Sequence, residues 1–181
     1  MASMTDTTTS RTLAARPARV AHGLAAFRIF LGLIFGINGL AKVLNKGAYD
    51  FKVVSFGLID RGTARGLLAG YAGPKSHAIA PLKTFYNQVV LAHWAPWSIF
   101  LTVAEVTVGV TLIFGIASRL GALIGLGLIL PLQVMVANNG GYLFDFAPDW
   151  VPLVILLLVP SGRAWGFDGL LAARFGDHWP F

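Results

Sequence analysis

Long apolar stretches constrain the fold of this chain more than any other feature. Residues 22–44, 97–117 and 120–137 carry few charged side chains, and each is about as long as a helix that crosses a bilayer. A fourth stretch, 148–166, reaches that length only when it is extended beyond its continuously apolar part, residues 150–159. Charged residues make up 12% of the chain, whereas soluble domains carry about 25%. We therefore predict an all-α fold, an integral membrane four-helix bundle.

The segments outside these spans differ from them in composition. Residues 1–21 form a polar, Thr-rich tail that we expect to be disordered, and residues 22–181 form a single four-span domain. The connector 45–96 holds no apolar run long enough to cross a membrane. Its apolar side chains recur at helical spacing in two groups, Phe51, Val54 and Leu58, then Leu82, Phe85, Val89 and Val90. We therefore expect interfacial amphipathic helices between the first and second spans.

Glycines within the spans predict where helices touch. Gly32 and Gly36 in the first span are four positions apart, and Gly121 and Gly125 repeat this spacing in the third. Small residues at this spacing let the backbones of two helices approach closely in lipid. We expect both pairs to form helix contact surfaces.

The basic residues indicate a membrane surface. The net charge is +6, and the basic side chains flank the apolar spans, where anionic lipid headgroups supply the counter-charge. We therefore expect membrane lipids as partners and no nucleic acid. Arg119 in one short loop, and the acidic turn bearing Asp145 and Asp149, place both termini in the cytoplasm of a multi-pass protein of the cell membrane. The basic connector argues for the opposite orientation.

Glu105 is the only glutamate of the chain, and it lies in the middle of the apolar run WSIFLTVAEVTVGVTLIFGIA. A carboxylate at bilayer depth costs about 2.5 to 3.5 kcal/mol on insertion scales, unless it is paired, protonated or hydrated. Such acids usually face a cavity or a partner charge, which favours a functional role for Glu105. The alternative is a protonated side chain that only hydrogen-bonds a neighbouring helix.

Few other polar side chains lie within the spans, and they are Arg28, Asn38, Lys42 and Gln133. Asn38 and Lys42 are four residues apart and share a helix face. The rise of an α-helix places Asn38 and Gln133 near the layer of Glu105, with Lys42 nearer the outer interface and Arg28 on the inner side of centre. We predict a polar pocket with Glu105 at its floor. Taken singly, these residues could instead bond between helices or reach the interface.

Three segments resemble the DoxX/DoxD family of small four-span bacterial membrane proteins. They read RIFLGLIFGINGLAKVL, AEVTVGVTLIFGIASRLGALIGL and GRAWGFDGLLAARF. The positions that carry the resemblance are Arg28, Gly32, Asn38, Gly39, Lys42, Glu105, Gly109, Gly115, Arg119, Gly166 and Asp168. The connector, which ends in FYNQVVLAHWAPW, is more similar to the DoxD branch, the membrane subunit of archaeal thiosulfate:quinone oxidoreductase.

The resemblance implies a membrane subunit of a quinone-linked oxidoreductase. In that hypothesis a quinone headgroup occupies the pocket of Asn38, Gln133, Arg28 and Lys42, and Glu105 relays protons. The chain has no cysteine, its histidines lack the spacing of haem ligands, and no catalytic or redox-cofactor motif is present. We therefore expect no haem, metal or iron–sulfur cluster in this chain, and electrons must come from partner protein subunits. The alternative is a non-catalytic accessory or scaffold subunit packed against a larger membrane complex.

Overall fold

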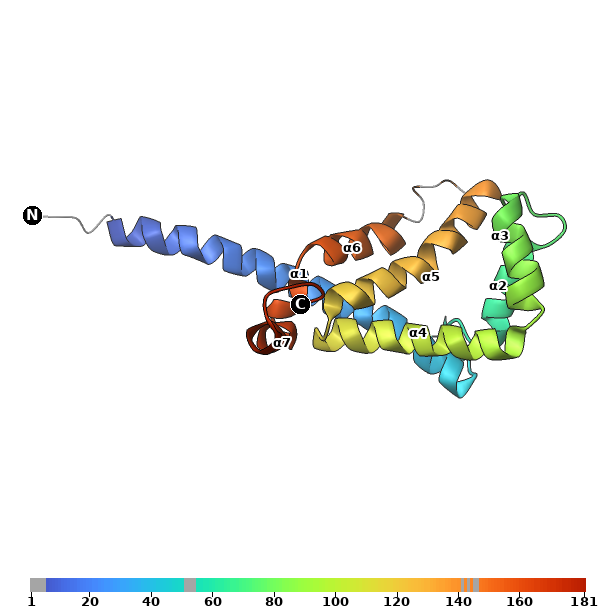
Figure 1. Cartoon of the computed structure of the whole chain (residues 1–181), viewed down its shortest axis with the longest axis horizontal. Helices are drawn as coiled ribbons and strands as arrows, with labels where there is room; N and C mark the ends of the chain where they lie inside the picture. The colour runs from blue at the N-terminus through green and yellow to red at the C-terminus, as the bar shows by residue number, and fades with distance from the viewer. Residues whose placement is uncertain (1–5, 51–54, 141, 143, 145–146) are drawn as a thin grey trace, which may run out of the picture.

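The computed structural model describes residues 6–50, 55–140, 142, 144 and 147–181, which are mainly helical (Figure 1). Three helices in this part of the chain are long and apolar enough to cross a membrane. They are residues Ala18–Leu44 of α1 (Asp6–Leu44), α4 (Trp94–Phe114) and α5 (Ser118–Asn138). The prediction of a membrane protein with transmembrane helices is confirmed at the level of helix length and composition.

The fourth apolar stretch forms a shorter helix than predicted. α6 (Ala147–Leu158) has 12 residues, so it is about 18 Å long, less than the roughly 30 Å of a bilayer core. Val159 precedes a proline, and a residue in that position disfavours helical backbone angles. The predicted span 148–166 therefore ends early, and the chain continues through the 3-10 turn η2 (Ser161–Arg163) into α7 (Asp168–Phe175).

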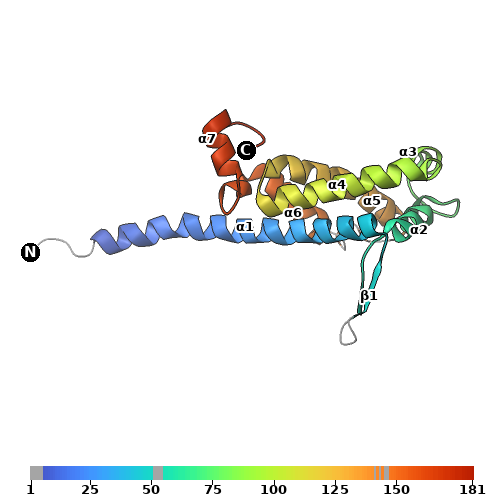
Figure 2. The ribbon, with the colours of Figure 1, turned by 90° about the horizontal axis from the view of Figure 1, so that it is seen from below.

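The helix α1 begins earlier than the sequence indicates. It starts at Asp6, so it includes most of the segment 1–21 for which the sequence predicts a disordered tail. Figure 2 shows this first part of α1 extending past the other helices, beyond the end of the bundle where α4 joins α5.

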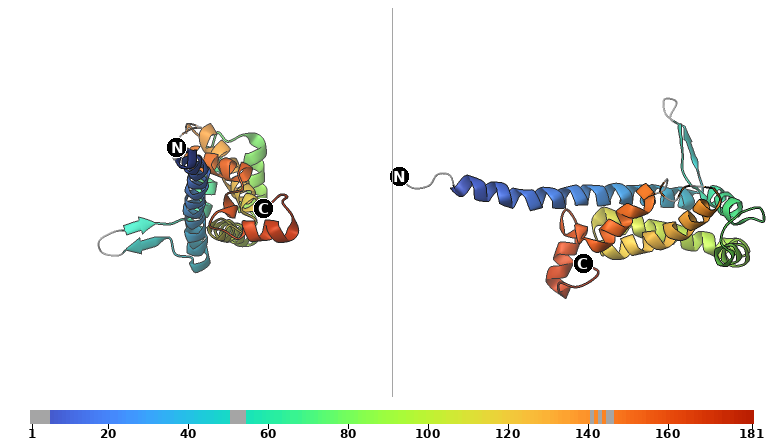
Figure 3. Two further views of the ribbon diagram at one scale, coloured as in Figure 1. Left: turned by 90° about the vertical axis from the view of Figure 1, so that its left-hand side faces the viewer. Right: turned by 90° about the horizontal axis from the view of Figure 1, so that it is seen from above.

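The connector contains a hairpin that the sequence did not predict. β1 (Ala48–Asp50) and β2 (Ser55–Gly57) pair antiparallel, with Tyr49 opposite Phe56, and the hairpin projects sideways from the bundle (Figure 3). The helix predicted from Phe51, Val54 and Leu58 is therefore wrong where the chain is described, because the residues on both sides of 51–54 form strands. Phe51 and Val54 themselves lie outside the described residues.

The remainder of the connector is helical, as predicted. α2 (Arg61–Ala72) is followed by α3 (Ala80–Phe85), which runs directly into the π-helix η1 (Tyr86–Leu91). Leu82, Phe85, Val89 and Val90 all lie on these last two helices. Asp60 starts α2, because its carboxylate accepts a hydrogen bond from the free N–H of Thr63.

Glycines bring the helices into close contact, as predicted. A Cβ on Gly109 of α4 would lie 2.6 Å from the Cα of Gly36, and a Cβ on Gly32 would lie 2.7 Å from the backbone nitrogen of Ile113. On α5, a Cβ on Gly121 would overlap the side chain of Thr111 on α4. The backbones of α1 and α4 therefore touch over two turns, a separation that only glycine permits.

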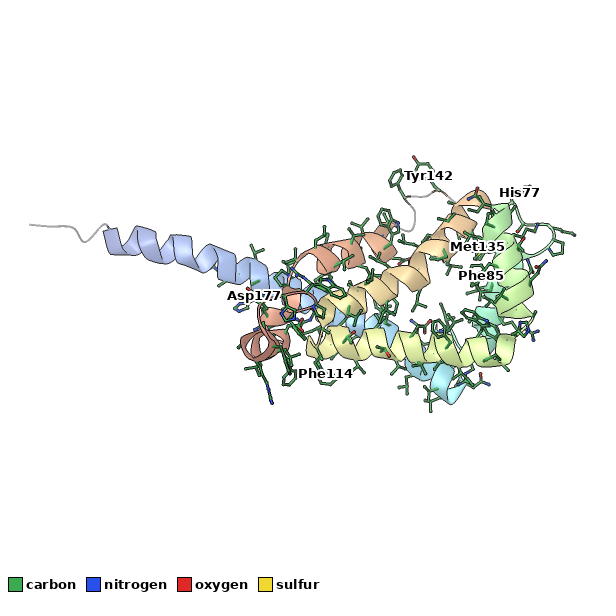
Figure 4. All side chains as sticks on the ribbon, viewed as in Figure 1. His77, Phe85, Phe114, Met135, Tyr142 and Asp177 are labelled. Carbon is green, nitrogen blue, oxygen red and sulfur yellow. The ribbon has the colours of Figure 1, made fainter. Side chains whose placement is uncertain are left out.

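Two apolar clusters fill the bundle. One joins α1, α4, α5 and α6 and consists of Leu31, Phe35, Val108, Leu112, Ala122, Leu126, Leu153 and Leu156. The other packs the connector helices against the end of α5 and consists of Leu68, Ala72, Ala78, Val90 and Met135. Figure 4 shows Met135 on the side of α5 that faces these connector helices. The second cluster closes the end of the bundle near which the polar residues described next lie.

Candidate functional site

Lys42 and Glu105 form an ion pair inside the bundle. Lys42 lies in the last turn of α1 and Glu105 near the middle of α4, and the Lys42 Nζ is 2.8 Å from the Glu105 Oε2. Their side chains are 3% and 19% exposed. The lone glutamate of the chain thus faces a partner charge from another helix, which offsets part of the cost of its burial.

The close crossing of α1 and α4 explains why these two side chains meet. Gly39 is three residues before Lys42, and a Cβ at Gly39 would lie 2.8 Å from the Cγ2 of Val106 and 3.0 Å from its backbone nitrogen. Val106 directly follows Glu105 in the chain. A side chain larger than glycine at this position would push the helices apart and lengthen the ion pair.

Asn38 and Lys42 together hold the peptide groups of Ile59. The Ile59 N–H donates to the Asn38 Oδ1 at 3.0 Å, and the Lys42 Nζ donates to the Ile59 carbonyl at 2.7 Å. The Asn38 Nδ2 donates to the carbonyl of Ile34 at 3.0 Å, so both ends of this amide are engaged. The helix face that the sequence predicts for Asn38 and Lys42 therefore anchors the segment that leads into α2.

Gln133 pairs with an acid that sequence reasoning missed. Its Nε2 donates to the Oδ2 of Asp149 at 3.3 Å, and the side chain is 5% exposed. Its Oε1 is buried and has no hydrogen-bond partner. The sequence placed Asp149 in an acidic outer turn with Asp145, which lies outside the described residues, whereas Asp149 belongs to the first turn of α6. The sequence does place Asp149 directly before the continuous apolar run 150–159, a position that could have indicated a role at the start of that helix.

These polar groups line one cavity of about 330 Å³ between α1, α2, α4, α5 and α6. Four of the five residues predicted for the pocket contribute to its wall, together with Asp149 and Tyr71. The lining residues are Leu31, Ile34, Phe35, Asn38, Lys42, Ile59, Leu67, Tyr71, Glu105, Ile129, Leu132, Gln133, Val136, Pro148 and Asp149. The volume lies at the lower end of the range for small-molecule sites, about 300 to 1,000 Å³. Apolar walls with a few convergent polar groups are also typical of such sites.

A smaller cavity of about 140 Å³ shares Lys42 and Glu105 with the first. It extends toward α2 and η1, and its remaining wall is apolar except for Tyr86. Burial raises the pKa of the Tyr86 phenol, which lies outside the membrane-spanning helices. The two cavities therefore adjoin each other, and the Lys42–Glu105 pair lines both.

Arg28 does not line either of these cavities. It lies fourteen residues before Lys42 on α1, about 21 Å along the helix, and is fully buried. Its Nε donates to the carbonyl of Leu112 at 2.8 Å, near the end of α4. Its two Nη atoms donate to the carbonyls of Ser161, at 2.6 Å, and Trp165, at 3.0 Å. The arginine predicted for the pocket instead joins α1 and the C-terminal segment to the end of α4.

Asp168 binds the N–H groups at the start of α5, as Arg28 binds a carbonyl near the end of α4. Ala117, the residue before this helix, has a left-handed φ of 48° and offers no side-chain cap. The Asp168 carboxylate accepts hydrogen bonds from the N–H of Ala117 at 2.6 Å, from the N–H of Ser118 at 3.0 Å and from the Ser118 hydroxyl at 2.6 Å. A cation at the end of α4 and an anion at the start of α5 each match the local helix dipole. These contacts are structural, and they explain both buried charges without a ligand.

A larger hollow of about 540 Å³ lies near this end of the bundle, between Val20 and Leu24 of α1 and residues 159–164. It opens to the surface and its wall is mainly apolar, so it suits a lipid chain better than a polar headgroup. Within the described part of the chain, no three His, Asp or Glu side chains gather as metal ligands.

Comparison of the chain with protein family models, with curated proteins and with solved structures gave no match in any of the three. The cavity and its polar groups are therefore the features that bear on function.

Proposed function

We propose that the cavity around Lys42 and Glu105 binds the headgroup of a quinone, and that the chain is the membrane subunit of a quinone-linked oxidoreductase of the DoxX type. The observation that carries this proposal is a buried ion pair in the wall of a small, otherwise mainly apolar cavity between membrane helices. A quinone headgroup is a flat apolar ring with an oxygen at each end. It needs apolar walls and polar groups on opposite sides. Lys42 on α1 and Gln133 on α5 supply polar groups to the cavity from two different helices.

The pair also provides a route for protons. Reduction of a quinone to the hydroquinone takes up two protons, and the reverse reaction releases two. A carboxylate in the wall of the site can give or accept them in turn. Glu105 lines both the larger and the smaller cavity, so it can exchange a proton on one side with the ring and on the other with the connector. We assign it the role of proton relay.

The electrons must come from a partner subunit, because we identify no redox-cofactor motif in the sequence. We propose that the chain works in the cell membrane with both termini in the cytoplasm. We also propose that α6 and η2 complete a fourth crossing, which makes the bundle four-helical. In support of this, α6 packs along α5, and the chain returns to the end where α4 joins α5 (Figure 3).

The test of this proposal is Glu105→Gln in the complex purified from its native membrane with the subunits that co-migrate. The amide is nearly isosteric and still hydrogen-bonds, so the complex should assemble. Quinone-linked turnover should be lost, because an amide cannot cycle a proton. Glu105→Asp is the matched control, because it keeps the carboxyl and should keep part of the activity. Full activity of the Gln variant would refute the relay.

A photoreactive quinone tests binding independently of turnover. Peptides that contain Asn38 or Gln133 should carry the label, and unlabelled quinone should compete with it. Label confined to lipid-facing positions such as Phe30 and Ile99, which are 58% and 55% exposed, would refute a site in the cavity.

One observation favours a second candidate, a non-catalytic accessory subunit. Lys42 and Asn38 both bond to Ile59, so the ion pair and its neighbours already have a structural role in anchoring the connector. On this reading Glu105→Gln leaves both the assembly and the activity of the larger complex almost unchanged.

A further inference from the structure

The orientation of the Gln133 amide is fixed by its neighbour. An ionised carboxylate accepts hydrogen bonds and cannot donate them, so Gln133 must turn its Nε2 toward Asp149. The amide oxygen then points away from that acid. It is buried in a side chain that is 5% exposed and lines the cavity, and it has no donor among the described residues.

An unpaired buried carbonyl calls for a donor. Native proteins leave few such acceptors without a partner. A buried acceptor gives up its hydrogen bonds to water on folding, and that free-energy cost is not recovered if no protein group donates to it. No described side chain supplies that donor to Gln133. A group that enters the cavity can supply it if it carries an O–H or N–H.

The other polar groups of the cavity also favour a ligand that donates. Glu105 and Asp149 are carboxylates, which accept hydrogen bonds when ionised. The amide of Asn38 is engaged at both ends, and Lys42 already donates to Glu105 and to the Ile59 carbonyl. The donors left in the wall are the third N–H of Lys42 and the hydroxyl of Tyr71, against the Gln133 Oε1 and the second oxygens of Glu105 and Asp149, so acceptors outnumber donors.

We infer that the cavity binds the reduced, hydroxyl-bearing form of the headgroup, a hydroquinone, in preference to the quinone, and that the Gln133 Oε1 accepts a hydrogen bond from one of its hydroxyls. This inference rests on the proposed function for the identity of the ring. A hydroquinone has two O–H donors, whereas a quinone presents only acceptors. The acceptor-rich wall can accept hydrogen bonds from the hydroquinone and none from the quinone, so it binds the hydroquinone more tightly.

The experiment compares a short-tailed hydroquinone with the matching quinone, and with the monomethyl and dimethyl ethers of the hydroquinone. The purified chain is held in lipid nanodiscs without oxygen, and dissociation constants are measured by equilibrium dialysis. The hydroquinone should bind about tenfold more tightly than the quinone, the ratio expected for one additional buried hydrogen bond. The dimethyl ether, which has no donor, should bind no better than the quinone.

Gln133→Met identifies the acceptor, because methionine has a similar length and no amide. The variant should lose about tenfold in affinity for the hydroquinone and little for the quinone. Asn138→Met is the matched control, since it removes an exposed amide from the same helix outside the cavity wall. It should change neither affinity.

The outcomes separate the inference from the proposed function. Quinone binding as tight as hydroquinone binding would overturn the inference and leave the quinone site standing. An equal loss for both ligands in Gln133→Met would also overturn it, because Gln133 would then only support the cavity. Absence of binding by all four ligands would overturn the proposed function itself. If Gln133→Met fails to fold, the comparison of the four ligands on the natural chain still decides the matter.

Discussion

Replacing Asp168 should show how strongly the two helix ends at the α4–α5 turn depend on a distant segment. The carboxylate is fully buried and accepts three hydrogen bonds, two from the backbone at the start of α5 and one from the Ser118 hydroxyl. Its charge also acts on Arg28, which is fully buried as well.

The expected loss follows from these contacts. Asp168→Asn keeps one acceptor and sacrifices at least one charge-assisted bond, so it should lower the free energy of unfolding by about 1.5 to 3 kcal/mol. Asp168→Ala removes every acceptor and leaves Arg28 without its opposing charge, which should cost about 3 to 5 kcal/mol. Ala117, the residue before α5, has no polar side chain with which to cap the helix in place of Asp168.

The assay is reversible unfolding in detergent micelles, followed by tryptophan fluorescence. Asp177→Asn serves as the control, because it makes the same chemical change on an exposed carboxylate that pairs with the exposed Arg163. Exposed pairs contribute little to stability, so this variant should unfold almost as the natural chain does. The reasoning fails if Asp168→Asn is as harmless as Asp177→Asn.

Three further outcomes are expected. Gly109→Val should lower the thermal unfolding temperature, because the new side chain forces α1 away from α4. Gly127→Val is the control and should leave that temperature almost unchanged, since there is open space at its Cβ; equal unfolding temperatures of the two variants would contradict the close packing. Lys42→Met should lower the free energy of unfolding by about 3 to 5 kcal/mol in chemical denaturation, because it leaves the Glu105 carboxylate buried without its partner. Adding Glu105→Leu should restore much of that stability; a double variant no more stable than Lys42→Met would contradict this. Backbone hydrogen bonding holds the pKa of Asp60 below its usual range, so capping of α2 is present above the ordinary aspartate pKa and lost as pH falls through the lowered one. The protection of the Thr63 amide against hydrogen exchange, relative to its intrinsic rate at each pH, should therefore fall in acid in the natural chain, whereas in Asp60→Ala it should not depend on pH in this range.

The long helices were predictable because burial in lipid depends on local composition. The predicted spans 97–117 and 120–137 correspond to Trp94–Phe114 and Ser118–Asn138, with each end within three residues, and the first span ends at Leu44 as predicted. Twenty apolar residues in a row have few alternatives to a membrane helix. The pocket followed from the same regularity, because helical rise places Asn38 and Gln133 near the layer of Glu105, and the spacing of four residues puts Lys42 on the helix face of Asn38.

The features that the sequence did not predict depend on distant backbone groups. Arg28 lies on an inward face, but its partners are carbonyls of Leu112, Ser161 and Trp165, and no periodicity indicates which carbonyls will be near. The β1–β2 hairpin likewise depends on hydrogen bonds between two segments, and the spacing of apolar residues within one segment wrongly predicted a helix there. Asp149 was grouped with Asp145 in an acidic outer turn, whereas its carboxylate accepts a hydrogen bond from Gln133 of α5.

The caps at the α4–α5 turn also impose an order on biosynthesis. Arg28 and Asp168 are 140 residues apart, so at 5 to 20 residues per second roughly 7 to 28 seconds separate their synthesis. Once residue 138 has been synthesised, α1, α4 and α5 are complete, yet the hairpin between α4 and α5 still has exposed ends that only water can satisfy. A chain that ends before residue 161 has neither the carbonyls of residues 161–165 to which Arg28 donates nor the Asp168 carboxylate. Both helix ends at the α4–α5 turn are therefore satisfied only after the C-terminal segment has been made.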